Sequence, residues 1–220
     1  MMKIRRLIVI SFSIALLLAT ASCTLVPIDP DASPGAAGSS VLRARNVDEY
    51  LDEYWEDDIL PEIMDRRVDL GTLLAAVQSG GWDHAGQSYG EIRGDIGASY
   101  TFIIYDTATV VETNTQSRNG FIVVQIDGYD EYEIRLSIGP ALTGSAIRDS
   151  LRFVDFNQFV NQVDFARLAT ELNTRGNERA MENTDIFALD GKTIEFTGAF
   201  VAPEANNIIS IMPIFLEEVN

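Results

Sequence analysis

The stretch FIVVQIDGYDEYEIRLSI, residues 121–138, carries the clearest structural signal in the chain. Within residues 131–138 apolar and polar residues alternate, which is typical of a β-strand with one face in water. Residues 121–126 form another strand-like run, and Asp127-Gly128-Tyr129-Asp130 supplies turn residues between the two runs. We therefore predict a β-hairpin that turns at these four residues.

Strand-like runs also flank this hairpin on both sides. They lie at residues 100–105 and 107–112 before it and at residues 193–201 and 208–216 after it. Each run is rich in β-branched and aromatic residues or alternates with period two. The middle and the end of the chain are therefore expected to build one sheet.

Two helical patterns precede the strands. Asn46 offers a capping side chain with an acid three residues later, and apolar residues then recur every four positions. Pro61 is expected to end or kink this first helix. A second helix is expected to start after Asp69 as its N-cap and to stop at Gly80-Gly81.

A segment rich in phenylalanine separates the hairpin from the last two strands. We expect a short helix at residues 145–151 and a longer one from Asp164, whose apolar residues share one face. Phe153, Phe156 and Phe159 are expected to pack under the sheet.

These elements predict an α+β fold in which N-terminal helices pack on a curved antiparallel sheet or a small OB-like barrel. Residues 46–220 are expected to form a single domain, or two closely packed lobes at residues 46–150 and 151–220.

The first 22 residues have the pattern of a signal peptide. Lys3, Arg5 and Arg6 precede an apolar run over residues 7–19, and small residues follow it. A helix needs about 20 apolar residues to span a bilayer, so a permanent transmembrane anchor is not expected.

Cys23 is the only cysteine of the chain and follows these small residues directly. The segment LATASC, residues 18–23, resembles the lipobox of bacterial lipoproteins, although Thr20 stands where leucine is usual. Lipidation would make Cys23 an acylated N-terminus that carries fatty acids such as palmitate and holds the protein at a membrane. The alternative is cleavage after Ala21 at an ordinary A-x-A site, which leaves a free thiol.

Residues 24–45 are rich in Pro, Gly, Ala and Ser and show no apolar periodicity, so residues 23–45 are expected to be the lipidated cysteine and a flexible tether. Removal of residues 1–22 takes away three positive charges and no negative ones, which changes the net charge from −17 to −20. Such a surface repels nucleic acid, which is not expected as a partner.

The sequence lacks the residues that several functional classes require. His84 is the only histidine, so there is no His pair or His–Cys set for zinc, and no G-x-S-x-G elbow occurs. The turn at residues 127–130 lacks the order of an EF-hand loop. We expect no metal, no cofactor and no catalytic residue, and the acids of residues 48–58 are expected to lie on the solvent face of the first helix.

One polar set stands out in segments that are otherwise apolar. It consists of Arg148, Asn157, Asn161 and Gln162. These groups either tie the Phe-rich loop to neighbouring backbone or, beside Phe residues, bind a sugar or a peptide segment.

Four segments carry a family resemblance: CTLVPID at residues 23–29, IGPALTGSAIRD at 138–149, FVDFNQFVNQ at 153–162 and GKTIEFTGAF at 191–200. Together they resemble a family of predicted periplasmic lipoproteins known only as domain of unknown function 2291. The resemblance implies lipidation at Cys23, a periplasm-facing position on the cell membrane or outer membrane, and sugar-uptake transporter components as genomic neighbours. The last segment also resembles a strand of an oligonucleotide/oligosaccharide-binding barrel.

The expected function is that of a non-catalytic accessory or binding module of the cell envelope, associated with sugar ABC transport or with other envelope proteins. Two alternatives stay open. One is an envelope hydrolase that uses two facing carboxylates, and the other is a structural protein that binds envelope partners through an exposed apolar patch. Thr24 lacks the acidic character of an inner-membrane retention signal, so transfer to the outer membrane is expected.

Overall fold

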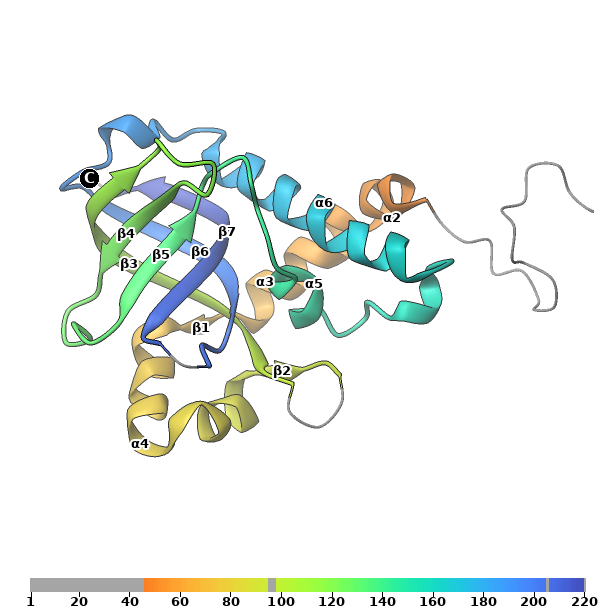
Figure 1. Cartoon of the computed structure of the whole chain (residues 1–220), viewed down its shortest axis with the longest axis horizontal. Coiled ribbons are helices and arrows are strands. Elements are labelled where there is room, and N and C mark those ends of the chain that lie inside the picture. The colour runs from red at the N-terminus through yellow and green to blue at the C-terminus, as the bar shows by residue number, and fades with distance from the viewer. Residues whose placement is uncertain (1–45, 95–97, 205, 220) are drawn as a thin grey trace, which may run out of the picture. The chain divides into compact units, whose positions relative to one another are not determined.

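The computed structural model of the chain describes residues 46–94, 98–204 and 206–219, all within one compact unit. The predicted signal peptide, Cys23 and the tether lie outside the described residues. Figure 1 shows a ring of strands beside a layer of helices.

The helical elements are α2 (Val47–Tyr54), the π-helical turn η1 (Trp55–Ile59), α3 (Leu60–Arg66), α4 (Leu70–Tyr89), α5 (Ala146–Ser150), the 3-10 turn η2 (Phe156–Gln158), α6 (Gln162–Met181) and the 3-10 turn η3 (Ile186–Ala188). The strands are β1 (Val68–Asp69), β2 (Glu91–Ile92), β3 (Tyr100–Asn114), β4 (Phe121–Gln125), β5 (Glu133–Ser137), β6 (Thr193–Val201) and β7 (Ile208–Glu218).

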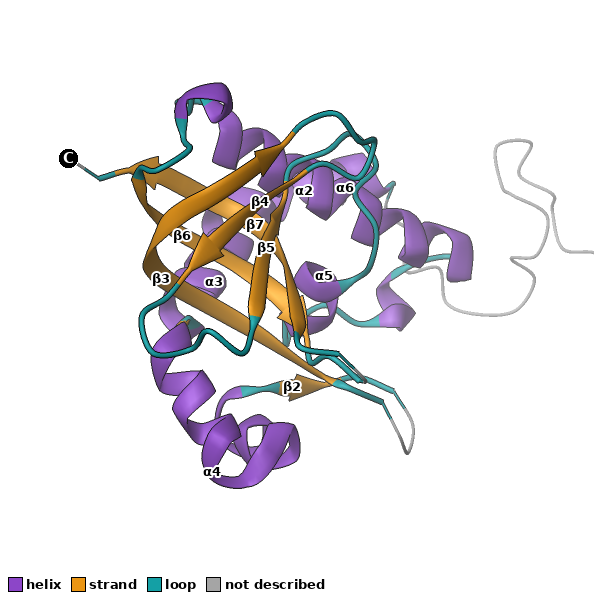
Figure 2. Cartoon of the chain, turned by 60° about the vertical axis from the view of Figure 1, so that its left-hand side comes forward, coloured by secondary structure: helices purple, strands orange, loops and turns teal. Residues whose placement is uncertain are grey.

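Five strands close into a barrel in the order β3-β4-β5-β7-β6, because β6 pairs back onto β3 (Figure 2). The predicted α+β class with a small barrel is confirmed. The pairing differs from a purely antiparallel sheet at two points: β5 and β7 run parallel inside the barrel, and the short β1 pairs parallel with β3. The two runs predicted at residues 100–105 and 107–112 are one strand, since the β3–β6 ladder continues from Thr101 to Thr109 without a break.

The predicted hairpin is present as β4 and β5. The two strands are antiparallel, with Phe121 opposite Ser137 and Val124 opposite Ile134. Alternate residues of both strands are buried, as the period-two pattern indicated. Gly128 adopts a φ of 88° in the connecting turn, a conformation that favours glycine.

The interior of the barrel and one face of α4 form the first hydrophobic core, which we call the barrel core. Phe102 and Phe200 stack inside it with ring centroids 5.3 Å apart. Leu70, Leu73 and Leu74 of α4 are fully buried against the barrel. The predicted cap is present, because the Asp69 carboxylate accepts a hydrogen bond from the Thr72 N–H at 2.7 Å.

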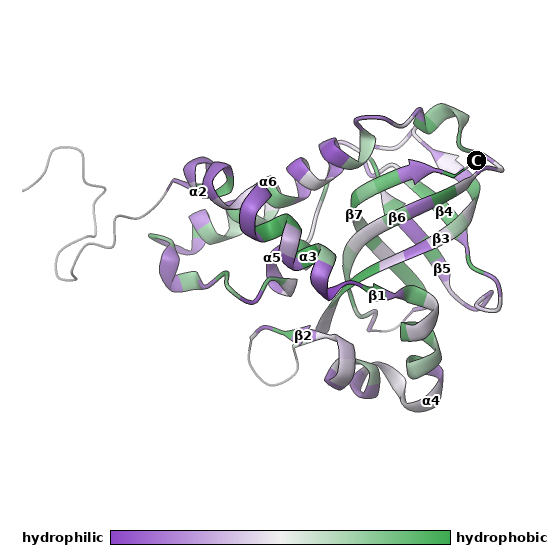
Figure 3. Ribbon diagram, turned by 180° about the vertical axis from the view of Figure 1, so that it is seen from behind, coloured by the Kyte–Doolittle hydropathy of each residue, from purple (hydrophilic) through white to green (hydrophobic). Residues whose placement is uncertain are grey.

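A second core lies outside the barrel, between its strands and the helices α2, α3, α5 and α6, and we call these helices the helical layer. Ile103, Ala199 and Ile214 contribute from the strands, and Leu51, Ile63, Ile147, Leu168 and Leu172 contribute from the helices. Figure 3 shows that these helices combine hydrophilic and hydrophobic turns, as expected for helices buried on one side.

Three helix boundaries differ from the prediction. Pro61 does not end the first helix, because it occupies the first turn of α3, where a missing N–H costs little, and η1 joins α2 to α3. The last long helix starts at Gln162 with Asn161 as its cap, not at Asp164. Gly81, with a φ of 79°, kinks α4, but the helix resumes and continues to Tyr89.

The expected burial of the Phe-rich segment is right for Phe159 and wrong for Phe156. The Phe159 side chain is 6% exposed and belongs to the second core, whereas Phe156 is 45% exposed. Phe156 lies in η2, outside the helical layer, and its ring packs edge-to-face with that of Phe165. No helix in the described part of the chain has the length and apolar character needed to cross a membrane.

Candidate functional site

Arg148, the central residue of the predicted polar set, contacts residues of α5 and α6. Its Nη1 donates to the carbonyl oxygen of Phe165 at 3.0 Å, and its Nε donates to Asp149 at 2.8 Å. The guanidinium carbon lies 4.0 Å from the centre of the Phe165 ring. These contacts join α5 to α6, so Arg148 helps to hold the two helices together.

The three predicted amides lie on the surface of the same loop. Asn157 donates to Asp155 at 2.7 Å, and Asn161 caps α6 by accepting the N–H groups of Val163 and Asp164. Gln162 is the exposed first residue of α6. Within the described residues, no hydrogen bond joins Arg148 to any of the three amides.

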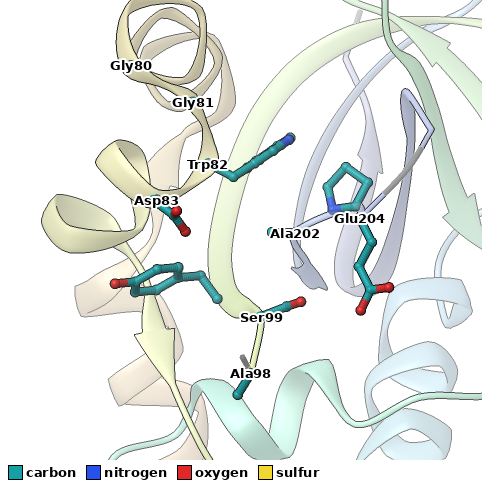
Figure 4. Close-up of a pocket in the computed structure, with 10 residues that line it drawn as sticks. Gly80, Gly81, Trp82, Asp83, Ala98, Ser99, Ala202 and Glu204 are labelled. Atoms are coloured by element: carbon teal, nitrogen blue, oxygen red, sulfur yellow. The ribbon is translucent and has the colours of Figure 1, made fainter. Parts of the chain in front are cut away.

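A pocket of about 370 Å³ lies elsewhere, where three segments that are distant in sequence meet. Its walls come from the kink of α4, from the residues that lead into β3, and from the β6–β7 loop (Figure 4). We call it the kink pocket. Trp82 and Tyr100 supply its aromatic surface, and Asp83, Ser99 and Glu204 supply polar groups.

Glycines at defined positions seat the two aromatic rings. Gly81 breaks α4 with a positive φ that other residues rarely adopt, and the kink places Trp82 at the barrel. The Trp82 ring centroid lies 5.8 Å from that of Phe102 and 5.8 Å from that of Phe200. A Cβ atom on Gly86 would lie 2.3 Å from the Tyr100 ring, so only glycine allows Tyr100 to lie against α4 at this point.

The β6–β7 loop is fixed to the entrance of β3. The N–H of Ala202 donates to the carbonyl oxygen of Tyr100 at 2.8 Å, which holds Pro203 and Glu204 beside the aromatic surface. Within residues 46–94, 98–204 and 206–219, the side chains of Asp83, Ser99 and Glu204 form no hydrogen bond or ion pair. These polar groups are available to a ligand.

The electrostatic character of the kink pocket is acidic. Asp83 and Glu204 line it, and its lining contains no arginine, lysine or histidine. Carboxylates accept hydrogen bonds and repel anions. The pocket therefore suits a ligand that is neutral or cationic, donates hydrogen bonds and has an apolar face for the aromatic rings.

His84 follows the pocket residue Asp83 directly but does not line the pocket. It is exposed in the second part of α4, and a Cβ atom on Gly80 would come within 2.7 Å of its side chain. Across the described ranges no group of three or more His, Cys, Asp and Glu side chains is placed to hold a metal ion.

The profile of one protein family, described as "Predicted periplasmic lipoprotein (DUF2291)", matches residues 13–217. The chain belongs to this family. The match includes Cys23, and membership makes this DUF2291 protein a periplasm-facing lipoprotein anchored by lipid to the cell membrane or outer membrane. No curated protein matches the chain.

Among solved structures, the DUF2291 chain is similar to an OB-fold protein from Thermotoga maritima. The TM-score is 0.64 at 21% sequence identity, over 80% of this chain and all of the other. At this identity the likeness shows the fold, and an OB-fold is a barrel of five strands, as found here.

The kink-pocket residues were not among the predicted site residues of this DUF2291 protein. Trp82 and Asp83 are adjacent, but Tyr100 and Glu204 are brought to them only by the closed barrel. The local signal that could have drawn attention to them is the Gly80-Gly81 pair directly before a tryptophan. It was interpreted as a helix stop, and the kink shows why glycine is needed there.

Proposed function

We propose that this protein is a non-catalytic accessory of the cell envelope that binds a neutral sugar in the kink pocket and serves a sugar-uptake transporter. The observation that carries the proposal is the combination of two aromatic rings with two carboxylates and no basic group in one pocket. The family itself is described only as a periplasmic lipoprotein.

Sugar chemistry fits this combination of groups. A pyranose presents hydroxyl donors around its rim, which the carboxylates of Asp83 and Glu204 can accept, and a flat C–H face, which can pack on Trp82 or Tyr100. A sugar phosphate would instead place negative charge beside two carboxylates in a chain of net charge −17. The proposal therefore specifies an uncharged sugar.

The proposed attachment is through Cys23. Twenty-two residues separate Cys23 from Asn46, the first described residue, and they reach about 70 Å when fully extended, so a tethered domain could meet a transporter in the same membrane. Mass spectrometry of the mature N-terminus tests this step. An unmodified chain that begins at Ser22 would contradict it, and membrane fractionation decides between the inner and the outer membrane.

The binding proposal can be tested by tryptophan fluorescence, because the chain has two tryptophans. Trp55 is buried in the helical layer, so Trp55→Phe leaves Trp82 as the reporter in the pocket. We expect one neutral mono- or disaccharide in a panel to produce a saturable change. A panel that leaves both the fluorescence and the melting temperature unchanged would contradict sugar binding.

Two exposed acids provide the matched variants. Glu204→Gln and Asp83→Asn keep the side-chain shape but remove the charge, and each should weaken sugar affinity about tenfold or more because a hydrogen bond to a charged group is lost. Glu56→Gln changes an exposed acid of η1, outside the pocket, and should leave affinity unchanged.

A second candidate, an envelope glycoside hydrolase, is favoured by the same two carboxylates, since a pair of acids that flanks one bond is the usual arrangement for glycoside hydrolysis. The two proposals differ in turnover. A hydrolase would release product from chromogenic glycosides, and Glu204→Gln would abolish release. A binding module would give saturable binding with no product.

A further inference from the structure

The segment that leads into α6, together with the first turn of α6, exposes three large apolar side chains within eight residues. They are Phe156, Val160 and Val163, with exposed fractions of 45%, 51% and 75%. Single exposed apolar side chains are common on protein surfaces and need no explanation. Three within eight residues form a candidate contact surface, which we call the α6 tip.

The α6 tip is held by its own hydrogen bonds. Asp155 accepts the N–H of Asn157 at 2.8 Å, and Asn161 accepts the N–H of Val163 at 2.8 Å. The Phe156 ring meets Phe165 edge-on, with ring centroids 5.5 Å apart. The loop therefore presents its apolar side chains from a fixed backbone, which lowers the entropy cost of using them as a contact.

The α6 tip lies at the end of the helical layer where the described chain begins. The Tyr50 hydroxyl donates to Gln158 Oε1 at 3.5 Å, and the Tyr50 and Phe159 ring centroids are 5.1 Å apart. Asp48, in the first turn of α2, pairs with Arg167 of α6 at 2.9 Å. Figure 1 shows the starts of α2 and α6 at the same end of the layer.

The segment that leads from Cys23 to this end contains only residues 24–45. With Cys23 acylated, the anchor is therefore joined by a short stretch of chain to the end of the domain that carries the exposed apolar side chains. A contact too weak to hold a free domain becomes effective when the anchor keeps the domain close to the lipid.

We propose that the α6 tip is a membrane-contacting surface that inserts Phe156, Val160 and Val163 into the interfacial region of the bilayer that holds the lipid anchor. The inference rests on Cys23 acylation and is independent of sugar binding. Asp155 before η2 and Asp164 in the first turn of α6 add negative charge beside the tip, whereas Asp48 of α2 is matched by Arg167, so the surface suits zwitterionic phospholipid and is repelled by anionic headgroups.

The test uses the acylated full chain, with acylation confirmed by mass, reconstituted in zwitterionic phospholipid vesicles. Acylation blocks the only native thiol, so Val163→Cys carries a polarity-sensitive fluorophore at a single site. Phe187→Cys is the matched control, because Phe187 is 78% exposed and lies in η3, beyond the other end of the 20-residue helix α6. That helix is about 30 Å long.

We expect lipid-borne quenchers to quench the label at position 163 several-fold more strongly than the label at 187. Val160→Asp, combined with Val163→Cys, should remove this difference without lowering the melting temperature, since residue 160 is exposed. Doping the vesicles with anionic lipid should reduce quenching at 163.

Equal, weak quenching at the two positions would overturn the proposal. Protection of position 163 only in native envelope membranes, and not in vesicles, would assign the surface to a protein partner instead. Energy transfer between differently labelled copies, without lipid quenching, would assign it to a second copy of the chain.

Discussion

The barrel and the helical layer differ in how their backbone groups are hydrogen-bonded. In the barrel, the N–H and C=O groups of each strand bond to those of the neighbouring strand. In the helical layer, arginine side chains donate to backbone carbonyl groups that are not part of any strand ladder. The β3–β6 ladder runs from Thr101 to Thr109 without interruption. In the helical layer, Arg66 donates to the carbonyl oxygen of Ser150 at 2.6 Å, and Arg148 donates to that of Phe165 at 3.0 Å.

Arg93 extends the same pattern from the other side. Its two terminal nitrogens donate to the carbonyl oxygens of Leu151 and Val154, each at 2.6 Å. The chain has 16 basic and 33 acidic residues, so cations are scarce, and three of them bind backbone carbonyls in the stretch from the last residue of α5 to the first turn of α6. Irregular segments lack ladder partners, and charged donors supply the missing bonds.

Carboxylates complete this arrangement and orient the arginines. Glu62 accepts from Arg66 at 2.7 Å, and Glu91 accepts from Arg66 at 2.6 Å and also pairs with Arg152. These acids are matched by guanidinium groups, in contrast to Asp83 and Glu204 in the kink pocket. The difference separates acids that stabilise the fold from acids that are available to a ligand.

The largest loss of stability is expected for a substitution in the barrel core. Phe200→Ala removes a fully buried ring that stacks on Phe102, and it should lower the free energy of unfolding by about 3 to 5 kcal/mol out of the roughly 5 to 15 typical of a domain. Urea unfolding should show Trp82 and Trp55 reporting one transition. Phe187→Ala, at an exposed position, is the control and should change little.

The next two variants compare a buried and a half-exposed phenylalanine in the loop that packs beside the helical layer. Phe159→Ala should cost about 3 to 5 kcal/mol, because its ring is buried against Tyr50. Phe156→Ala removes a half-exposed ring from the same loop and should cost about 1 kcal/mol or less. Equal losses in thermal or urea unfolding would show that exposure does not distinguish the two rings.

Arg148→Ala tests the role of arginine in the helical layer. It removes the guanidinium donor of the Phe165 carbonyl and leaves the Asp149 carboxylate with the longer ion pair to Arg93 at 3.8 Å, and it should lower the free energy of unfolding by about 1 to 3 kcal/mol. Arg148→Lys keeps the charge but cannot reproduce the planar fork, so it should recover only part of the loss. Normal melting together with lost sugar binding would instead place Arg148 at a ligand site.

Local patterns in the sequence were enough to predict the elements, and long-range contacts decided what could not be predicted. The hairpin at residues 121–138 and the caps at Asn46 and Asp69 depend on neighbours within a few positions, so they were found. The parallel β5–β7 pair and the kink pocket join segments far apart in the chain. Phe156 and Phe159 look alike in sequence, and only the path of the loop buries one of them.

The same distinction explains the predicted polar set. Arg148 and three amides share a Phe-rich region of the sequence, but the amides are exposed around the start of α6 and Arg148 donates to the Phe165 carbonyl of that helix. A residue that stands out by composition alone can therefore have a structural role, as a helix cap (Asn161) or as a link between two helices (Arg148). The kink-pocket acids, which lie in unremarkable polar stretches, carried no such compositional signal.

The smallest expected effect on stability is at Asp106, where β3 meets α4. The carboxylate of Asp106 accepts hydrogen bonds from backbone N–H groups, and among the described residues no arginine pairs with it. It accepts the N–H groups of Thr107 at 2.7 Å and Gly71 at 3.2 Å. Burial raises the pKa of Asp106 above its ordinary value, with a further contribution from the charge of Asp69, and the two N–H donors only partly oppose this.

A carboxyl whose folded-state pKa is raised contributes stability below its unfolded pKa, near about 4, and loses that contribution as the pH rises through the folded value. Asp106→Asn cannot ionise, so its stability relative to the native chain should increase as the pH rises from about 3 to 7, while at low pH the two should be close. Melting temperatures across this range measure the difference, with exposed Asp127→Asn as the control for general charge effects. A difference that grows toward low pH instead would mean that the Thr107 and Gly71 donors outweigh burial, and that Asp106 stabilises the junction as an anion.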